Sequence, residues 1–322
     1  MFDSTKAKQR EAKRERGFSL VELLVAMTIL LVVSSVVTSG IMQMSKTQRT
    51  IVNRTQMHTD VRSATELLQQ EIGQSGAITL PPGVAPTLTA AVAVGATTAT
   101  LSTVSGMFVG EKLLIGKGDN ADDLDQAETV GIASISGTTV TFSSTFVDKH
   151  ASGAPVRVVG VFGTGIVPPG AANGSTGSVL KLYGDVNGDG NMVYVEYTCD
   201  TSTTPGFLYR SMSSITAGSK AANVTLLDNV LVNPPASVGG ANPPCFVYQT
   251  GTANGNTYVT DVAVTLTVQT QFRDPVTQQF QTETKALLNI SPRNLVDGYY
   301  LDSMGQPNRL QPMPASVANL LP

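Results

Sequence analysis

The sequence predicts an α+β protein in which one long N-terminal helix packs on an antiparallel β-sheet body, with a small all-β module inserted between them. Two observations carry this prediction. Residues 18–72 contain no proline and pass from an apolar to an amphipathic pattern. The rest of the chain is rich in Thr, Ser, Val, Gly and Pro, which favour short strands joined by turns. At 322 residues the chain exceeds one average domain and has room for an appendage.

A basic leader precedes an apolar segment. Residues 1–17 contain six basic and three acidic side chains, a net charge of +3, which leaves −6 for the rest of the chain. Residues 18–37 then carry one charge, Glu22, over a length sufficient to span a bilayer. A secretory signal peptide has its cleavage site after the apolar stretch, whereas here the small residue, Gly17, comes before it. The sequence therefore predicts that the membrane-spanning segment stays in the mature protein.

The junction between leader and apolar segment resembles a known processing motif. Residues 16–25, RGFSLVELLV, are similar to the prepilin peptidase motif of type IV pilins and type II secretion pseudopilins. This resemblance implies cleavage between Gly17 and Phe18, N-methylation of Phe18, and a role in assembly for Glu22. It also implies three kinds of partner: prepilin peptidase, other major and minor pilins, and the inner-membrane assembly platform.

The position of Glu22 agrees with that resemblance. An unpaired carboxylate inside a bilayer costs about 2.5 kcal/mol or more and normally marks function. In the family, the partner is the α-amino group at Phe18 of a neighbouring subunit. The alternative is a plain signal anchor with a chance Glu near the membrane face.

Helix-compatible sequence continues to about residue 72, and Gly73 and Gly76 then predict a stop. The second half is amphipathic, so one face of a helix spanning residues 18–76 should pack on a sheet. Residues 34–40 include serines, a threonine and a glycine, which weaken a helix more gently than the proline of many pilins. The apolar face comprises Met57, Val61, Ala64, Leu68 and Ile72.

Residues 87–159 predict the separate β-module. Strands are expected at residues 97–101, 112–115, 128–135, 138–142 and 155–159, with a hairpin turn at Ser136 and Gly137. The strings GMFVGE (106–111), GTTV (137–140) and HASGAPV (150–156) resemble a small module that recurs in phage-tail and surface proteins. The module either contacts a partner or forms a decorated loop without a role of its own.

Residues 178–295 predict the β-sheet body, followed by a C-terminal tail over residues 296–322. Strands are expected at residues 180–183, 192–197, 206–210, 246–248, 261–270 and 282–289, and Val262, Val264, Leu266 and Val268 alternate along one buried face. Four short features and their order along the chain resemble PilW-type minor pilins. They are an aspartate-rich hairpin at residues 185–191 and the strings LYR (208–210), LDNV (227–230) and PRN (292–294).

The aspartate-rich hairpin satisfies the twelve-residue calcium-loop pattern, DVNGDGNMVYVE, over residues 185–196. Asp185, Asn187, Asp189 and Asn191 are the candidate calcium ligands. Glu196 is a weaker candidate, because residues 192–197 read as a strand that carries it away from the ion. Asn187-Gly188 and Asp189-Gly190 also favour a simple hairpin turn, which is the alternative.

Cys199 and Cys245 are the two cysteines of the chain. Because the resemblance implies an exported protein, we expect one disulfide between them, with two free buried thiols as the alternative. In the chain-entropy model such a bond stabilises the fold by about 4 kcal/mol.

The remaining residues predict a protein that is not an enzyme. His58 and His150 are the two histidines, and neither lies in a metal-protease or nucleophile motif. The mildly acidic body lacks basic runs, so nucleic-acid binding is not indicated.

The resemblance implies a structural minor pilin that helps to initiate or cap a type IV pilus. Such a chain begins as a single-pass inner-membrane protein and ends in a cell-surface pilus or periplasmic filament. A minor pseudopilin of type II secretion and a pilus-tip adhesin subunit are the alternatives.

Overall fold

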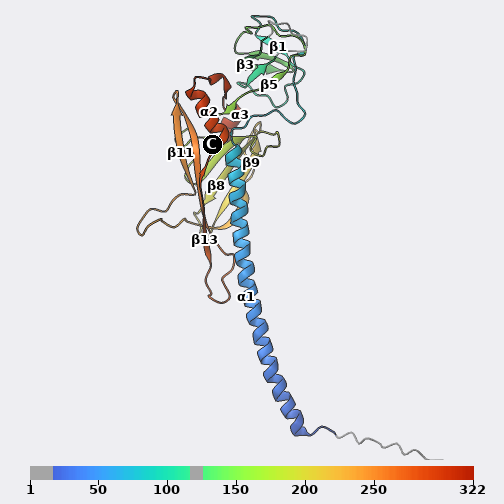
Figure 1. Ribbon diagram of the computed structural model, residues 1–322, viewed down its shortest axis with the longest axis vertical. Coiled ribbons are helices and arrows are strands. Elements are labelled where there is room, and N and C mark those ends of the chain that lie inside the picture. The colour runs from blue at the N-terminus through green and yellow to red at the C-terminus, as the bar shows by residue number, and fades with distance from the viewer. Residues whose placement is uncertain (1–16, 117–125) are drawn as a thin grey trace, which may run out of the picture.

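The computed structural model describes residues 17–116 and 126–322 (Figure 1), and it confirms the α+β class. The helix α1 (Leu20–Gln74) has 55 residues, or about 80 Å of length. Its N-terminal half stands free of the rest of the chain, and its C-terminal half runs along the body (Figure 1). Helix α1 is unbroken through Ser34 and Gly40, and the Ser35 hydroxyl donates to the carbonyl of Val32 at 2.8 Å.

The N-terminal part of α1 has the length and the apolar composition of a helix that can cross a membrane. Its most apolar window has a mean hydropathy of 2.6, and none of that window is buried in the protein. The C-terminal half differs, because Met57, Val61, Ala64, Leu68 and Ile72 are all buried. The five positions of the predicted apolar face therefore pack into the core.

The module has its own five-stranded antiparallel sheet, with strand order β1-β4-β3-β2-β5. Leu113, Ile115, Val140 and Phe142 lie in a hydrophobic core made of module residues. Gly137 forms the β3–β4 turn with a φ of 59°. The strands are β1 (Thr98–Thr100), β2 (Lys112–Ile115), β3 (Glu128–Ser136), β4 (Thr139–Phe142) and β5 (Val156–Val158).

The body is a seven-stranded antiparallel sheet of order β11-β12-β10-β9-β8-β7, in which β13 also pairs with β12. The strands are β7 (Val179–Gly184), β8 (Val193–Asp200), β9 (Gly206–Ser214), β10 (Val224–Leu231), β11 (Phe246–Ala253), β12 (Asn256–Gln269) and β13 (Thr282–Ile290). The residues of α1 pack on one face of this sheet, against Leu182, Val195, Val264 and Leu266 among others.

Strand β10 was not among the predicted strands. Asp228 and Asn229 interrupt its apolar pattern, Asn229 has a φ of 56°, and the pairing with β9 shifts register twice. Such irregular pairing removes the two-residue alternation on which strand prediction depends.

The C-terminal segment packs into the body rather than trailing from it. It contains α2 (Arg293–Ser303), the short 3₁₀ helix η1 (Pro307–Arg309), β14 (Leu310–Gln311) and α3 (Ala315–Leu320). Helix α2 crosses the predicted boundary at residues 295 and 296, and Leu295, Val317 and Leu320 are buried. The Lys181 ammonium also donates to the carbonyl of Leu321 at 2.5 Å. The body therefore includes the predicted tail.

The same segment joins the module to the body. Strand β14 pairs in parallel with β6 (Val161–Phe162). The Gln311 amide accepts from the Lys112 N–H at 2.8 Å and donates to the carbonyls of Lys112 and Val159 at 2.8 and 2.6 Å. The module consequently sits at the end of α1 that is opposite the helix N-terminus (Figure 1).

Candidate functional site

The predicted cleavage point lies just before the first turn of α1. Gly17, Phe18 and Ser19 precede the helix, and Ser19 at the N-cap has extended backbone angles of −70° and 140°. Phe18 is 77% exposed, and no described atom lies within 4 Å of where a side chain on Gly17 would begin. Gly17 and Phe18 are therefore both exposed among the described residues.

Glu22 occupies the third position of the helix. Its carboxylate accepts the backbone N–H of Ser19 at 3.4 Å, as in the acidic half of a capping box. The helix N-terminus also favours a negative charge there. Across residues 17–116 and 126–322, no basic side chain lies within ion-pair distance of Glu22. Within the described residues, the cap N–H of Ser19 is the hydrogen-bond partner of this carboxylate.

The N-terminal half of α1 exposes apolar side chains on all its faces. Leu20, Leu30 and Met44 are 75, 65 and 74% exposed, and the large apolar side chains between them are similarly uncovered. A helix that is apolar all round is stable only when lipid or other protein surrounds it. The N-terminal half of α1 is thus expected to be stable when a membrane or neighbouring helices surround it.

The family described as the prokaryotic N-terminal methylation motif matches residues 12–38. The motif indicates a type IV pilin-like or pseudopilin protein. It implies processing by prepilin peptidase and assembly with other pilins, and proteins with this motif are structural rather than enzymatic. Together with the exposed apolar helix, the prepilin-type motif is consistent with membrane anchoring before assembly.

Other comparisons add little to this assignment. No curated protein matches the chain. A solved structure, the tailspike of an Acinetobacter baumannii bacteriophage in complex with capsular saccharide of A. baumannii, is 21% identical over 24% of this chain and 14% of its own. The TM-score is 0.21, and a likeness at this level supports no conclusion about fold or binding.

The aspartate-rich loop connects β7 to β8. The two oxygens of Asp185 accept the N–H groups of Asp189 and Gly190, each at 3.1 Å, and Asp189 accepts the N–H of Asn191 at 2.9 Å. Gly188 and Gly190 have positive φ angles of 67° and 84°. The loop is thus a tight turn held by its own carboxylates.

The full calcium-loop ligand set does not come together in this turn. Glu196 lies in β8, where its carboxylate accepts from the Tyr194 hydroxyl at 2.6 Å and the Lys220 ammonium at 2.7 Å. The donors near the turn are Asp185, Asn187, Asp189 and Asn191, of which Asn187 donates toward the Met212 sulfur at 4.0 Å. Calcium binding by this smaller set stays a prediction.

The structure contains the expected disulfide between Cys199 and Cys245, whose Cα atoms are 6.4 Å apart. The bond links the end of β8 to the residue that precedes β11, and both cysteines are buried in the main core. It therefore ties together two strands that are separated by 46 residues in sequence.

A buried ion pair that the sequence analysis missed fixes α1 on the sheet. Glu71, 1% exposed, pairs with Arg210 of β9 and accepts the Tyr197 hydroxyl of β8 at 2.5 Å. Burial, and then the Glu71 carboxylate, raises the pKa of Tyr197. Glu71 follows Leu68 by three positions on the apolar face, and this charge on an apolar stripe was the available signal.

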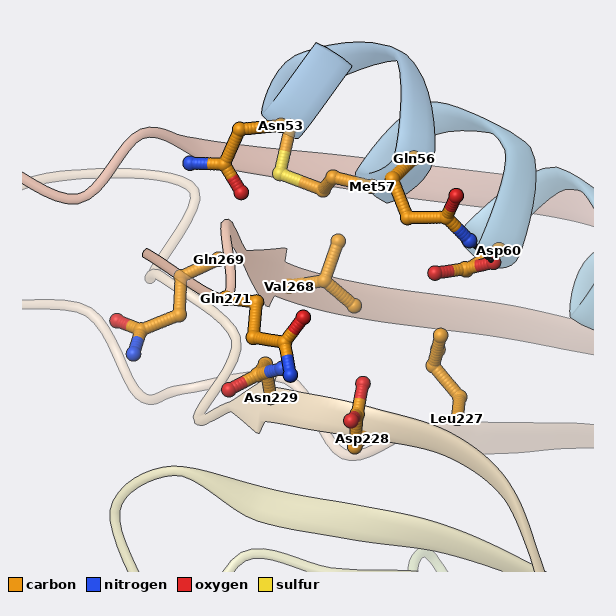
Figure 2. A pocket seen from close by; sticks show the side chains of 10 residues that line it. All are labelled: Asn53, Gln56, Met57, Asp60, Leu227, Asp228, Asn229, Val268, Gln269 and Gln271. Atoms are coloured by element: carbon orange, nitrogen blue, oxygen red, sulfur yellow. Dashed lines mark hydrogen bonds between the residues drawn. The ribbon is translucent and has the colours of Figure 1, made fainter. Parts of the chain in front are cut away.

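A polar hollow of about 250 Å³ lies between α1 and the ends of β10 and β12 (Figure 2). On the α1 side of the hollow, Asp60 accepts from the Gln56 amide at 2.8 Å. The lining is made of Asn53, Gln56, Met57, Asp60, Leu227, Asp228, Asn229, Val268, Gln269 and Gln271. These amides and carboxylates make a hydrogen-bonding surface at the point where the helix leaves the sheet.

Proposed function

We propose that this chain is a minor pilin of PilW type that helps to initiate or cap the assembly of a type IV pilus. The observation that carries the proposal is the unpaired apolar half of α1 with Glu22 near its start. This arrangement has no stable place in water, but it fits first a bilayer and then a bundle of like helices.

Assembly follows from the geometry at the helix start. Cleavage after Gly17 creates an α-amino group on Phe18, which N-methylation leaves positively charged. This charge, on a neighbouring subunit, supplies the partner that Glu22 lacks within the described chain. The pairing neutralises the carboxylate as the helix passes from lipid into the filament core, and it also fixes the axial position of the subunit.

The place of the module favours an end position in the filament. Because helices are drawn out of the membrane, their N-termini point toward the filament base. The module lies at the opposite end of α1, held there by Gln311 (Figure 1). A subunit stacked directly above would meet this module, so a tip position, as an initiating or capping subunit requires, accommodates it.

A minor pseudopilin of type II secretion shares the leader, the helix and the end position, and it is the nearest alternative. A pilus-tip adhesin subunit is a second alternative, in which the exposed module makes the contact. In each case the assembly platform of the inner membrane is the expected partner during insertion into the filament.

A gene deletion scored for two outputs tests the proposal. Loss of sheared surface pili and twitching motility with normal protein secretion is the expected result. Normal pili with secretion substrates retained in the periplasm replaces the proposal with the pseudopilin function. Complementation with Glu22→Ala should restore membrane insertion but not filament incorporation, whereas Glu66→Ala, an exposed carboxylate on the same helix, should restore both.

A further inference from the structure

The segment between β12 and β13, residues 270–281, is a built loop that we call the β12–β13 loop. The buried Asp274 carboxylate accepts the N–H groups of Val276 and Thr277 at 2.7 and 2.9 Å and the Gln281 amide at 2.9 Å. The backbone of Thr270 and Gln281 closes its base at 2.8 Å. These bonds hold one conformation of the loop without help from a partner.

This ordered loop nevertheless directs apolar side chains outward. Phe272 is 66% exposed and Val276 is 69% exposed. The hydrogen bonds within the loop hold these apolar side chains in exposed positions. An ordered loop with exposed large apolar side chains is typical of a contact surface.

The β12–β13 loop lies against α1 at the level where the helix leaves its apolar half. The Asn53 amide donates to the carbonyl of Phe272 at 2.6 Å and accepts its N–H at 3.4 Å. A cleft of about 720 Å³ separates the loop from the helix, and its walls run from Ser45 to Gln56 on α1 and from Gln271 to Pro275 on the loop.

The sequence of α1 places the membrane surface at this same level. After Glu22 the next charged residue is Lys46, so residues 23–45 form an uncharged stretch of 23 residues, about 35 Å of helix. That length exceeds the hydrocarbon core and reaches the headgroup region. Cationic side chains at such a boundary extend into the headgroups.

The charge around the cleft is positive. Lys46, Arg49 and Arg54 follow one another on α1, and the next acidic residue is Asp60. From the loop, Arg273 contributes a second guanidinium to the cleft, 5.2 Å from the centre of the Phe280 ring. The carboxylate of Asp274 is buried, is bonded to its own loop and also contacts Thr50 of α1. Residues 18–322 carry −6 in sum, so this cluster is a local departure from the acidic body.

We propose that the β12–β13 loop and the adjoining face of α1 dock on the surface of an anionic phospholipid bilayer before assembly. Phe272 and Val276 enter the headgroup region, and Arg49 and Arg273 bind lipid phosphates from the two sides of the cleft. The inference rests on the membrane anchoring of α1. Docking sets the depth of the helix and the tilt of the body, and it ends when the subunit enters a filament.

Single tryptophan reporters test this proposal, because the chain contains no Trp. The full-length protein carries Phe272→Trp and is reconstituted into vesicles of phosphatidylcholine and phosphatidylglycerol, with lipids brominated near the headgroup for position 272 and in the acyl chain for position 30, or without brominated lipids. Leu30→Trp reports on the spanning helix, and Val147→Trp is an exposed control on the module. We expect severalfold quenching of the reporters at positions 30 and 272 and none at position 147.

The outcomes separate this proposal from the membrane anchoring on which it rests. Quenching at position 30 without quenching at position 272 overturns the docking alone, whereas no quenching at position 30 overturns the anchoring. The tryptophan emission at position 272 is also measured at increasing ratios of lipid to protein. A change in emission that disappears on this dilution assigns the surface to contact with a second copy, and it also overturns docking.

The arginine contribution has its own control. Joint replacement Arg49→Glu and Arg273→Glu in the Phe272→Trp protein should abolish the phosphatidylglycerol-dependent part of the quenching. Arg54→Glu, a neighbouring exposed charge outside the cleft, should leave most of it. Quenching that is equal in pure phosphatidylcholine and unaffected by the double replacement would refute phosphate binding.

Discussion

The two halves of α1 are one continuous helix in two different environments. The N-terminal half is apolar all round and is left exposed by the described residues, 17–116 and 126–322, while the C-terminal half is amphipathic and buries five apolar side chains against the sheet. The C-terminal half thus has its partners within the subunit. The N-terminal half exposes its apolar side chains, which is consistent with membrane anchoring, and the proposed function gives it lipid and then other subunits as partners.

Each half carries one carboxylate that shows the same difference. Glu71 is buried and satisfied by Arg210 and Tyr197 of its own chain. Glu22 is exposed, and among the described residues its carboxylate accepts the N–H of its own helix cap. A carboxylate whose partner lies within the chain contributes to the stability of the subunit, whereas one whose partner lies in another chain contributes to assembly.

The largest effect is expected from breaking the internal pair. Glu71→Ala leaves a mostly buried guanidinium on Arg210 and a buried hydroxyl on Tyr197 without their acceptor, which should lower the free energy of unfolding by about 3–5 kcal/mol. Denaturant unfolding of the full-length protein in detergent, followed by circular dichroism, measures this loss.

A matched pair on the same helix provides the control. Glu66 and Arg62 form an exposed ion pair, with side chains 60 and 76% accessible, so Glu66→Ala should cost less than about 1 kcal/mol. Equal losses for Glu66→Ala and Glu71→Ala would contradict the view that burial of the partner decides the contribution.

A third carboxylate, Glu111 of the module, sharpens the comparison because it is buried without a cationic partner. One oxygen accepts the N–H of Phe108 at 3.2 Å, and the other has no hydrogen-bond partner among the described residues. Burial raises the pKa of Glu111 to about 8. In the folded protein this group therefore stays protonated at a pH where the unfolded chain has released the proton.

This shift predicts a fall in stability with rising pH. Between the unfolded pKa, about 4.3, and the folded value the native state binds more protons, so the free energy of unfolding should decrease by about 1.4 kcal/mol per pH unit and level off above the folded value. Thermal unfolding over this range should show the slope, and Glu111→Gln should flatten it. An unchanged slope in Glu111→Gln, with Glu66→Gln as the exposed control, would assign the effect to another group.

The regular parts of the fold could be predicted from local pattern. Apolar spacing located both halves of α1, and alternation located β12, because every second residue from Val262 to Val268 is buried in the core. Strand β10 escaped because its bulged pairing hides the alternation. Helix α2 escaped because it has one buried apolar residue, Leu295, alongside Gly298 and Asp302, and its position depends on tertiary contacts.

The candidate site divides in the same way. Gly17, Phe18 and Glu22 lie in the contiguous stretch that the N-terminal methylation motif matches, so the local sequence alone is enough to locate them. The pair of Glu71 and Arg210 is 139 residues apart, and the contact of Asn53 with Phe272 spans 219. Contacts of this range depend on sheet register and helix placement, which local periodicity does not encode.

The smallest effect is expected in the β7–β8 loop, whose carboxylates have backbone N–H groups as partners. Asp185, Asn187 and Asp189 offer oxygens on one turn, but Glu196 is held by Lys220, so calcium should bind with a Kd of about 10⁻³ M and stabilise by about 0.4 kcal/mol at that concentration. A calorimetric titration of the full-length protein, repeated on Asp189→Asn and with magnesium, measures it. If no heat of binding is detected at millimolar calcium, the backbone N–H groups alone satisfy these carboxylates. Their partners then lie within the chain, as Arg210 and Tyr197 do for Glu71.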